Sequence, residues 1–357
     1  MDFNAFVVSL LKVAPDAISD LHFKVGGPPL LRINNNIRPA KFRPFAAEDT
    51  ERIASVFLTK AQRENMGSVR ELDTAYTLPD GQRFRVNLFR QRGTFSIVMR
   101  VIAKTIPTVE SLGLPPVLKD IAAEPRGLVM VTGITGSGKS STLAAMVNHI
   151  NHTRRAHILT IEDPIEYVHE DKLSSINQRE VGVDTESFAE ALRKGLRQDP
   201  DVIMVGEMRD LETVDIALKA AETGHLVMST LHTVDAAKTI GRIINVFPPE
   251  QHQEVRHQIA ANAKGIISQR LISTKDGKKR VPAMEIMRST ATIRNCITDH
   301  TKTALIRDVI EKGREVYHMQ SFDQHLAELF QEGVITREVA VENSANPADF
   351  ERALQFE

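Results

Sequence analysis

The second half of the chain alternates short apolar runs with stretches of helical pattern. The apolar runs cover residues 128–131, 157–161, 202–205 and 226–229. Runs of successive apolar residues are typical of strands that are buried on both faces of a parallel sheet. The pattern therefore predicts an α/β fold in which helices cover both faces of the sheet. In sheets of this kind, ligands bind at the carboxyl ends of the strands.

The first third of the chain mixes helical segments with alternating strands. Asp2 is a candidate N-cap for an amphipathic helix that extends to about Val13, before Pro15 ends it. Residues 47–65 are charged and helical in pattern. Strands are predicted at 21–25 and 30–33, on either side of a Gly-Gly-Pro-Pro turn, and at 83–89 and 94–102. We therefore expect a small α+β domain.

The last two of these strands predict a hairpin with a defined register. If residues 92–93 form a two-residue loop, Val86 faces Met99 on the apolar side. Arg85 then faces Arg100 on the opposite, polar side. Two guanidinium groups in such positions repel each other unless an anion lies between them, and a phosphate would serve. The alternative is a solvated strand face with acidic partners nearby.

A proline-rich segment separates the two patterns. Residues 104–119, KTIPTVESLGLPPVLK, contain three prolines and no sustained period, so we place the domain boundary there. The length of 357 residues is sufficient for two domains. We expect an N-terminal domain at 1–106, a linker at 107–118, a core domain at 119–289 and a C-terminal helical region at 290–357.

The sequence GITGSGKSS, residues 133–141, directly follows the first apolar run and precedes a helical pattern. Its spacing is that of a P-loop: glycines let successive N–H groups turn toward phosphate oxygens, Lys139 adds a positive charge, and the Ser140 hydroxyl is a ligand for Mg²⁺. A glycine-rich turn is the alternative. We predict that ATP with Mg²⁺ is bound by Gly133, Thr135, Gly136, Ser137, Gly138, Lys139, Ser140 and Ser141.

Carboxylates and histidines follow the other apolar runs. Glu162 comes after the second run and Glu207 after the third. A carboxylate at such a position can activate the attacking water or hold Mg²⁺. We predict that Glu162 is the general base and that Glu207 is the second carboxylate, which holds Mg²⁺. The fourth run lies between His225 and His232, and His232 is the better placed because it follows the carboxyl end. The alternatives are solvated carboxylates and hydrogen-bonded core histidines.

Charge and composition narrow the classes of partner. The chain has 45 Lys+Arg against 46 Asp+Glu and only 5% aromatic residues, which weighs against a nucleic-acid-binding protein. The single cysteine, Cys296, excludes an intrachain disulfide and a cysteine-rich zinc site. The N-terminus has no signal-peptide pattern, and no run approaches the roughly 18 apolar residues of a membrane span. We expect a cytoplasmic protein.

Five ordered motifs within residues 19–270 resemble the PilT-type ATPases of type IV pili, part of the larger type II/IV secretion ATPase superfamily. The motifs are SDLH, GITGSGKSS, TIEDPIEYVH, RQDPDVIMVGEMRD and TGHLVMSTLHT. The resemblance implies a PAS-like N-terminal domain, a RecA-like core and a homohexameric ring. It further implies an inner-membrane pilus platform protein as partner, and a location at the cytoplasmic face of the inner membrane.

The resemblance also assigns roles to residues. The Walker A motif of the family corresponds to residues 133–140, and its acidic box corresponds to residues 162–166. Its Walker B strand corresponds to the strand that ends at Glu207, and its histidine box to residues 225–232. Its trans-acting arginines correspond to Arg85 and Arg100. Hydrolysis of ATP between subunits, with Mg²⁺ held by Ser140 and Glu207, would then power pilus retraction and twitching motility.

Retraction is favoured over pilus extension or secretion. Extension and secretion ATPases usually add an N-terminal domain and a four-cysteine metal site, and this chain has one cysteine. Residues 292–297, TIRNCI, differ from the retraction signature at two positions, whereas residues 319–324, MQSFDQ, resemble PilU-type paralogues. An accessory motor that works with a paralogous pilus ATPase is therefore an alternative. Less favoured are a nucleic-acid-translocating ATPase and a nucleotide-gated adaptor without turnover.

Overall fold

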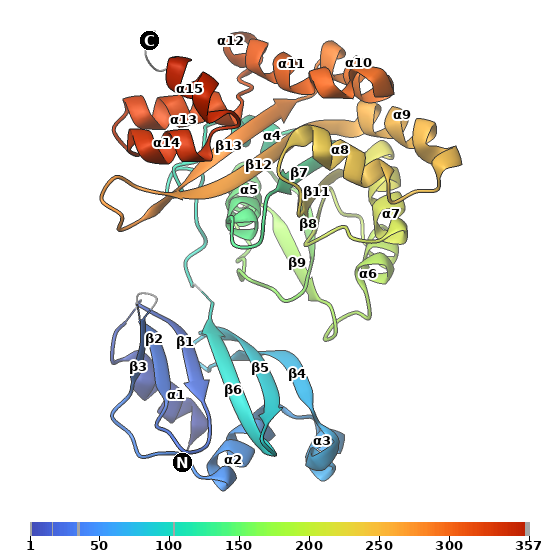
Figure 1. Ribbon diagram of the computed structural model, residues 1–357. Coiled ribbons are helices and arrows are strands. Elements are labelled where there is room, and N and C mark those ends of the chain that lie inside the picture. The colour runs from blue at the N-terminus through green and yellow to red at the C-terminus, as the bar shows by residue number, and fades with distance from the viewer. Residues whose placement is uncertain (1, 16, 34–35, 103, 354–357) are drawn as a thin grey trace. The chain divides into compact units, whose positions relative to one another are not determined.

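The computed structural model describes residues 2–15, 17–33, 36–102 and 104–353, which fall into two compact units, Met1–Thr105 and Ile106–Glu357 (Figure 1). The segment 107–118, which we expected to be a linker, lies in the second unit. Val109, Leu114 and Leu118 are buried in the core of that unit, so this segment is part of its packing.

The first unit is an α+β structure built on an antiparallel sheet of six strands in the order β3-β2-β1-β6-β5-β4. Phe6 and Val7 of the first helix and Ile53 of the second are buried in one core with the sheet residues Leu21 and Phe84. The elements are α1 (Phe3–Leu11), β1 (Ile18–Phe23), β2 (Leu30–Ile33), β3 (Asn36–Pro39), α2 (Ala47–Phe57), α3 (Lys60–Glu64), β4 (Glu71–Thr77), β5 (Arg83–Gln91) and β6 (Thr94–Val101).

Several local predictions for this unit are confirmed, and two strands were missed. Asp2 caps α1 by accepting a hydrogen bond from the Asn4 N–H at 3.0 Å. The helical region 47–65 is two helices, because Leu58 adopts an extended conformation after the first and Thr59 caps the second. The missed strands, β3 and β4, are the two edges of the sheet. None of their residues is fully buried, and they carry little apolar alternation.

The predicted hairpin register is confirmed. Val86 pairs with Met99 and Arg85 pairs with Arg100 across β5 and β6. The turn residues Arg92 and Gly93 have φ angles of 52° and 80°, which match the two left-handed positions of a type I′ turn. Arg85 and Arg100 are therefore side by side on the polar face of this sheet.

The second unit has a seven-stranded sheet in the order β13-β12-β7-β11-β10-β8-β9. All neighbouring pairs are parallel except the β12–β13 hairpin. The strands are β7 (Gly127–Thr132), β8 (His157–Glu162), β9 (Ser175–Glu180), β10 (Val202–Val205), β11 (Leu226–Leu231), β12 (Ala263–Ser273) and β13 (Arg280–Arg288). All four strands predicted from apolar runs are confirmed; β9, β12 and β13 were not predicted.

Helices cover both faces of this sheet. Successive residues of β7 point to opposite sides: Leu128 packs in one core with α6–α11, and Val129 packs in the other with α4 and α5. The helices are α4 (Val117–Ala122), α5 (Lys139–Thr153), α6 (Phe188–Gly195), α7 (Leu211–Glu222), α8 (Ala236–Ile244), α9 (His252–Asn262), α10 (Ala291–Thr298) and α11 (Ile306–Lys312). Among the described residues, no helix is both long enough and apolar enough to cross a bilayer.

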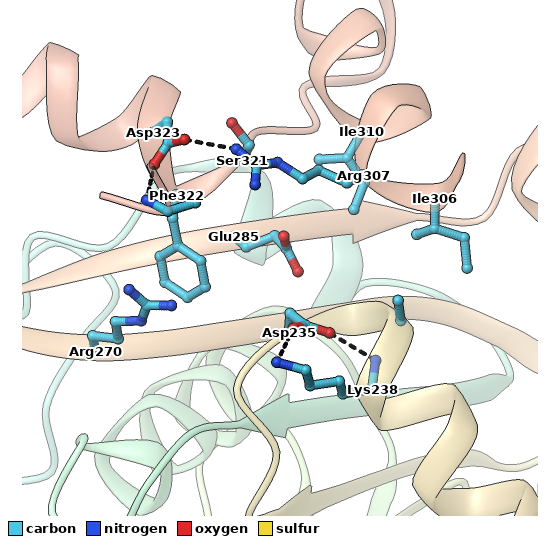
Figure 2. A pocket seen from close by; sticks show the side chains of 12 residues that line it. Asp235, Lys238, Arg270, Glu285, Ile306, Arg307, Ile310, Ser321, Phe322 and Asp323 are labelled. Carbon is cyan, nitrogen blue, oxygen red and sulfur yellow. Dashed lines mark hydrogen bonds and ion pairs between the residues drawn. The ribbon is translucent and has the colours of Figure 1, made fainter. Parts of the chain in front are cut away.

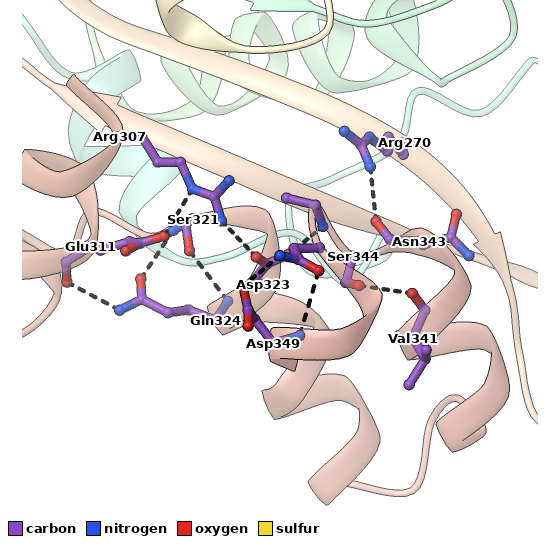
Figure 3. Close-up of polar contacts among 12 residues, drawn as sticks. Arg270, Arg307, Glu311, Ser321, Asp323, Gln324, Val341, Asn343, Ser344 and Asp349 are labelled. Atoms are coloured by element: carbon purple, nitrogen blue, oxygen red, sulfur yellow. Dashed lines mark hydrogen bonds and ion pairs between the residues drawn. The ribbon is translucent and has the colours of Figure 1, made fainter. Parts of the chain in front are cut away.

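The last helices pack against the β12–β13 edge of the sheet. They are α12 (Arg314–Tyr317), α13 (Phe322–Gln331), α14 (Arg337–Asn343) and α15 (Pro347–Ala353). The guanidinium of Arg270, on β12, lies 4.1 Å from the ring centroid of Phe322. It also donates to the Asn343 carbonyl at 2.9 Å (Figure 3). A cation–π contact and a hydrogen bond thus fix α13 and α14 to the sheet.

A cavity of about 220 Å³ lies between this edge, α8 and the C-terminal helices. Figure 2 shows Glu285, on β13, among its lining side chains with Asp235, Arg270 and Phe322. Glu285 is only 5% exposed, and one of its oxygens accepts a hydrogen bond from the Ala236 N–H at 2.8 Å. Burial raises the pKa of this carboxyl to about 7 despite that hydrogen bond.

Replacing Glu285 with glutamine is expected to stabilise the protein at alkaline pH. The folded-state pKa, about 7, is above the ordinary value of 4.5, so native stability falls as pH rises between these values. A glutamine does not ionise, and the free energy of unfolding at pH 8 should increase by roughly 2 kcal/mol. Urea unfolding at pH 5 and pH 8 measures this; an equal change at both values would contradict it. Glu332→Gln, at an exposed position, is the matched control.

Candidate nucleotide-binding and catalytic site

The predicted P-loop connects the carboxyl end of β7 to the start of α5. Two of its glycines have no room for a side chain. A Cβ at Gly133 would lie 2.4 Å from the carbonyl oxygen of Gln269, and one at Gly138 would lie 2.7 Å from the Nε2 atom of Gln269. Gly138 also has a φ of 89°, which L-residues rarely adopt. The loop is therefore shaped by glycine so that its backbone N–H groups are available to an anion.

Lys139 is buried at the start of α5. Its Nζ donates to the carbonyls of Gly133 at 3.0 Å and Ile134 at 3.1 Å, both in the loop itself. Burial lowers the pKa of Lys139, and the negative charges of Glu207 and Glu166 oppose this shift. The lysine is thus held at the loop with two acids nearby, and its bonds to carbonyls can be exchanged for stronger bonds to phosphate.

The hydroxyl groups of the loop differ in their surroundings. Thr135 and Gly136 are exposed at the tip of the loop, and Ser140 is exposed in the first turn of α5. Ser141 forms a hydrogen bond with the Tyr167 hydroxyl at 2.9 Å. Ser137 is buried, and its hydroxyl has no hydrogen-bond partner among the residues that the structure describes. The exposed Ser140 hydroxyl, together with a Ser137 hydroxyl that lacks a hydrogen-bond partner, suits a loop that receives a polar ligand.

Glu207 and His232 meet beside this loop. Glu207 follows β10, His232 follows β11, and β11 is the neighbour of β7 in the sheet. The Nε2 atom of His232 is 3.2 Å from one Glu207 oxygen, and Arg209 Nη2 is 2.6 Å from the other. Burial raises the pKa of Glu207, but Arg209 and His232 outweigh burial and the pKa is lowered. An ionised carboxylate is a suitable ligand for Mg²⁺.

Glu162 is the last residue of β8, on the far side of β10 from the P-loop strand. It is 8% exposed and accepts hydrogen bonds from Thr160 Oγ1 at 2.7 Å and Gln178 Nε2 at 3.0 Å. Burial raises its pKa. A raised pKa makes a carboxylate a stronger base, which is a property that a proton acceptor for water requires.

The structure does not bring His225 to this site. His225 precedes β11, and its carbonyl accepts a hydrogen bond from the N–H of Gly127, the first residue of β7. It therefore lies at the amino ends of the strands, whereas the P-loop follows their carboxyl ends. Its Nδ1 atom is 2.9 Å from the Ala220 carbonyl, which is the bonding of a structural histidine at a helix end.

Arg85 and Arg100 belong to the first unit. The Nε atom of Arg100 is 2.9 Å from one oxygen of Asp20, and Arg32 Nε is 3.2 Å from the other. Asp20 is buried on β1, so it pairs with Arg100 from the side of β6 that faces away from Arg85, and it does not lie between the two opposed arginines. The side chain of Arg85 is exposed and forms no hydrogen bond or ion pair within the described part of the chain. Asp20 was not predicted, although it lies within the SDLH motif.

Together, a P-loop between a buried parallel strand and a helix, and acids at the ends of neighbouring strands, define a P-loop ATPase with a RecA-like core. The family described as "Type II/IV secretion system protein" matches residues 76–353. The chain belongs to this family.

Individual relatives are similar over nearly the whole chain. It is 46% identical to the type IV pilus retraction ATPase PilT of Pseudomonas aeruginosa, over 94% of this chain and 97% of that protein. It is 40% identical to the type IV pilus ATPase PilU of the same organism, over 93% and 86%. A crystal structure of the pilus retraction motor PilT with bound ADP matches with a TM-score of 0.90 and 42% identity, over 99% of each chain. The resemblance to PilT-type ATPases is thereby confirmed.

Proposed function

We propose that this chain forms a homohexameric motor at the cytoplasmic face of the inner membrane, where it hydrolyses ATP to power the retraction of type IV pili. The observation that carries the proposal is the likeness, over 99% of both chains, to a retraction motor with bound ADP. The P-loop, with Lys139 and Glu207 beside it, is the part of this chain that would bind and cleave the nucleotide.

The residues present fit ATP with Mg²⁺. The loop N–H groups and Lys139 would hold the phosphates, and the exposed Ser140 hydroxyl and the ionised Glu207 would hold Mg²⁺. Bound there, the metal ion would neutralise charge on the phosphate oxygens. Glu162 accepts a proton from the attacking water, and its raised pKa favours this role. His232 contacts Glu207 and transmits changes at the phosphates to β11.

The neighbouring subunit completes the site. Arg85 and Arg100 would reach the phosphates of the next subunit and stabilise the charge that develops during cleavage. The support is that the side chain of Arg85 forms no hydrogen bond or ion pair within the described part of its own chain. In addition, Asp20 holds Arg100 in place beside it. Loss of these contacts after hydrolysis would release the N-terminal unit, and a rigid-body shift of this unit would act on the inner-membrane platform protein.

A second candidate is an accessory motor that acts together with a paralogous pilus ATPase. The 40% identity to PilU over 93% of the chain, and the PilU-like residues 319–324, favour it. The two functions differ in whether this chain drives retraction alone.

Complementation tests the proposal. In a strain that lacks all of its retraction motors, this chain should restore twitching motility, and phosphate release by the purified ring should not respond to single-stranded DNA. Restoration only when a paralogous motor is also supplied would establish the accessory function. Restoration of pilus assembly instead of retraction would contradict both, and stimulation by DNA would favour a nucleic-acid translocase.

A further inference from the structure

Gln269 lies directly behind the P-loop and was not among the predicted site residues. It is on β12, one residue beyond Ser268, which pairs with the last residue of β7, Thr132. Its side chain is 2% exposed, although it is polar and uncharged. A buried amide must satisfy both of its polar ends, so its partners show what it holds in place.

Both ends of this amide bond to the nucleotide-binding segment. The Nε2 atom donates to the Ser137 carbonyl at 2.6 Å, and the Oε1 atom accepts from Thr142 Oγ1 at 2.7 Å. The Ser137 carbonyl can only accept, which fixes the orientation of the amide. The side chain therefore bridges the loop and the first turn of α5, on either side of Lys139.

The main chain of the same residue supports the start of the loop. The main-chain carbonyl of Gln269 occupies the space that a Cβ at Gly133 would need. The side-chain Nε2 atom of Gln269 occupies the space that a Cβ at Gly138 would need. The strand behind the loop is itself anchored, because Arg270 contacts Phe322 (Figure 2) and donates to the Asn343 carbonyl (Figure 3). One residue on a fixed strand thus touches the loop at its beginning, its middle and its end.

We propose that Gln269 is a positioning residue for ATP binding and hydrolysis: it holds the Ser137 carbonyl and the Thr142 hydroxyl so that the loop N–H groups and Lys139 are oriented before nucleotide arrives. It does not touch the nucleotide. Preorganised donors lose no free energy to reorientation at the moment of reaction, so their loss affects both binding and turnover. The inference rests on the proposed function only in requiring that this loop binds nucleotide.

The decisive variant is Gln269→Glu, which keeps the shape and replaces the donor by a carboxylate oxygen. At pH 8 the carboxylate faces the Ser137 carbonyl, and we expect nucleotide to bind at least about tenfold more weakly than in the unchanged protein. At low pH the protonated acid can donate its O–H to the Ser137 carbonyl and accept from Thr142 with its other oxygen. The affinity of Gln269→Glu for nucleotide, relative to that of the unchanged protein at the same pH, should therefore increase as pH falls from 8 to 5.5.

Fluorescent ADP titration of the assembled ring, with thermal unfolding in parallel, provides the readout. A general structural role predicts a loss that does not depend on pH, and this result, or unchanged affinity at pH 8, would overturn the proposal. Gln269→Met, which cannot form these hydrogen bonds at any pH, should bind ADP more weakly by the same factor at pH 8 and pH 5.5, in contrast to the recovery expected of Gln269→Glu. If the glutamate variant does not fold, unchanged ADP affinity of Gln269→Met would overturn the proposal. Gln198→Met, at an exposed position, is the control. If the unchanged protein bound no ADP, the proposed function would fail instead.

Discussion

Replacement of Lys139 by alanine is expected to lower kcat by at least about a thousandfold. The Lys139 ammonium is buried at the loop, where it donates to the carbonyls of Gly133 and Ile134, and alanine leaves no positive charge at this position. Without it, the negative charge that forms on the phosphates during cleavage loses the compensation that the loop itself provides. Phosphate release at saturating ATP measures the effect.

Lys219→Ala is the matched control for this variant. Lys219 is an exposed lysine on α7 whose Nζ is 2.7 Å from Asp215, and a surface ion pair of this kind contributes little. The control should retain its turnover, and both variants should keep the thermal stability of the unchanged protein. If Lys139→Ala retained more than a tenth of the activity, the loop would not be the catalytic phosphate site.

Glu207→Gln is expected to lower kcat by about a hundredfold or more. The amide has the shape of the carboxylate but no charge for Mg²⁺, and it weakens the contacts with His232 and Arg209. The Mg²⁺ concentration for half-maximal turnover should increase as well, which a general loss of folding would not cause. Steady-state kinetics at graded Mg²⁺ concentrations separates the two effects.

Glu212→Gln is the control for the charge change. Glu212 forms an exposed ion pair with Arg193 on the same unit, and its substitution should leave turnover and the Mg²⁺ response unchanged. An unaltered Mg²⁺ response in Glu207→Gln would mean that Glu207 does not hold Mg²⁺. Glu162 and Glu166 would then be the candidate Mg²⁺ ligands.

The buried strands and the P-loop could be predicted because their signals are local. Each of the four strands is a mostly apolar run, and the loop motif needs its residues at fixed spacing. The unpredicted β9, SINQRE, is an edge strand of the sheet and mostly polar, so no run of apolar residues marks it. The apolar residues of 107–118 pack in the second unit because of partners distant in sequence, which local composition does not reveal.

The site was predictable where a residue follows a strand end. Glu207 and His232 are adjacent because β10 and β11 are neighbours, and their motifs already marked them. Their supporting partners depend on tertiary packing: Gln269 reaches Ser137 across 132 positions, and Asp20 reaches Arg100 across 80. His225 shares a motif with His232, but the length of one strand separates them.

The central claim is that each catalytic site combines the P-loop of one subunit with the arginines of another. It is tested most directly by mixing two inactive variants, Lys139→Ala and Arg85→Ala, under conditions that exchange subunits. The account predicts recovered phosphate release, since some interfaces then pair an intact loop with an intact arginine. A chain carrying both substitutions, mixed with Arg85→Ala, should recover nothing. Equal inactivity of both mixtures at full assembly, or full activity of Arg85→Ala alone, would contradict the claim.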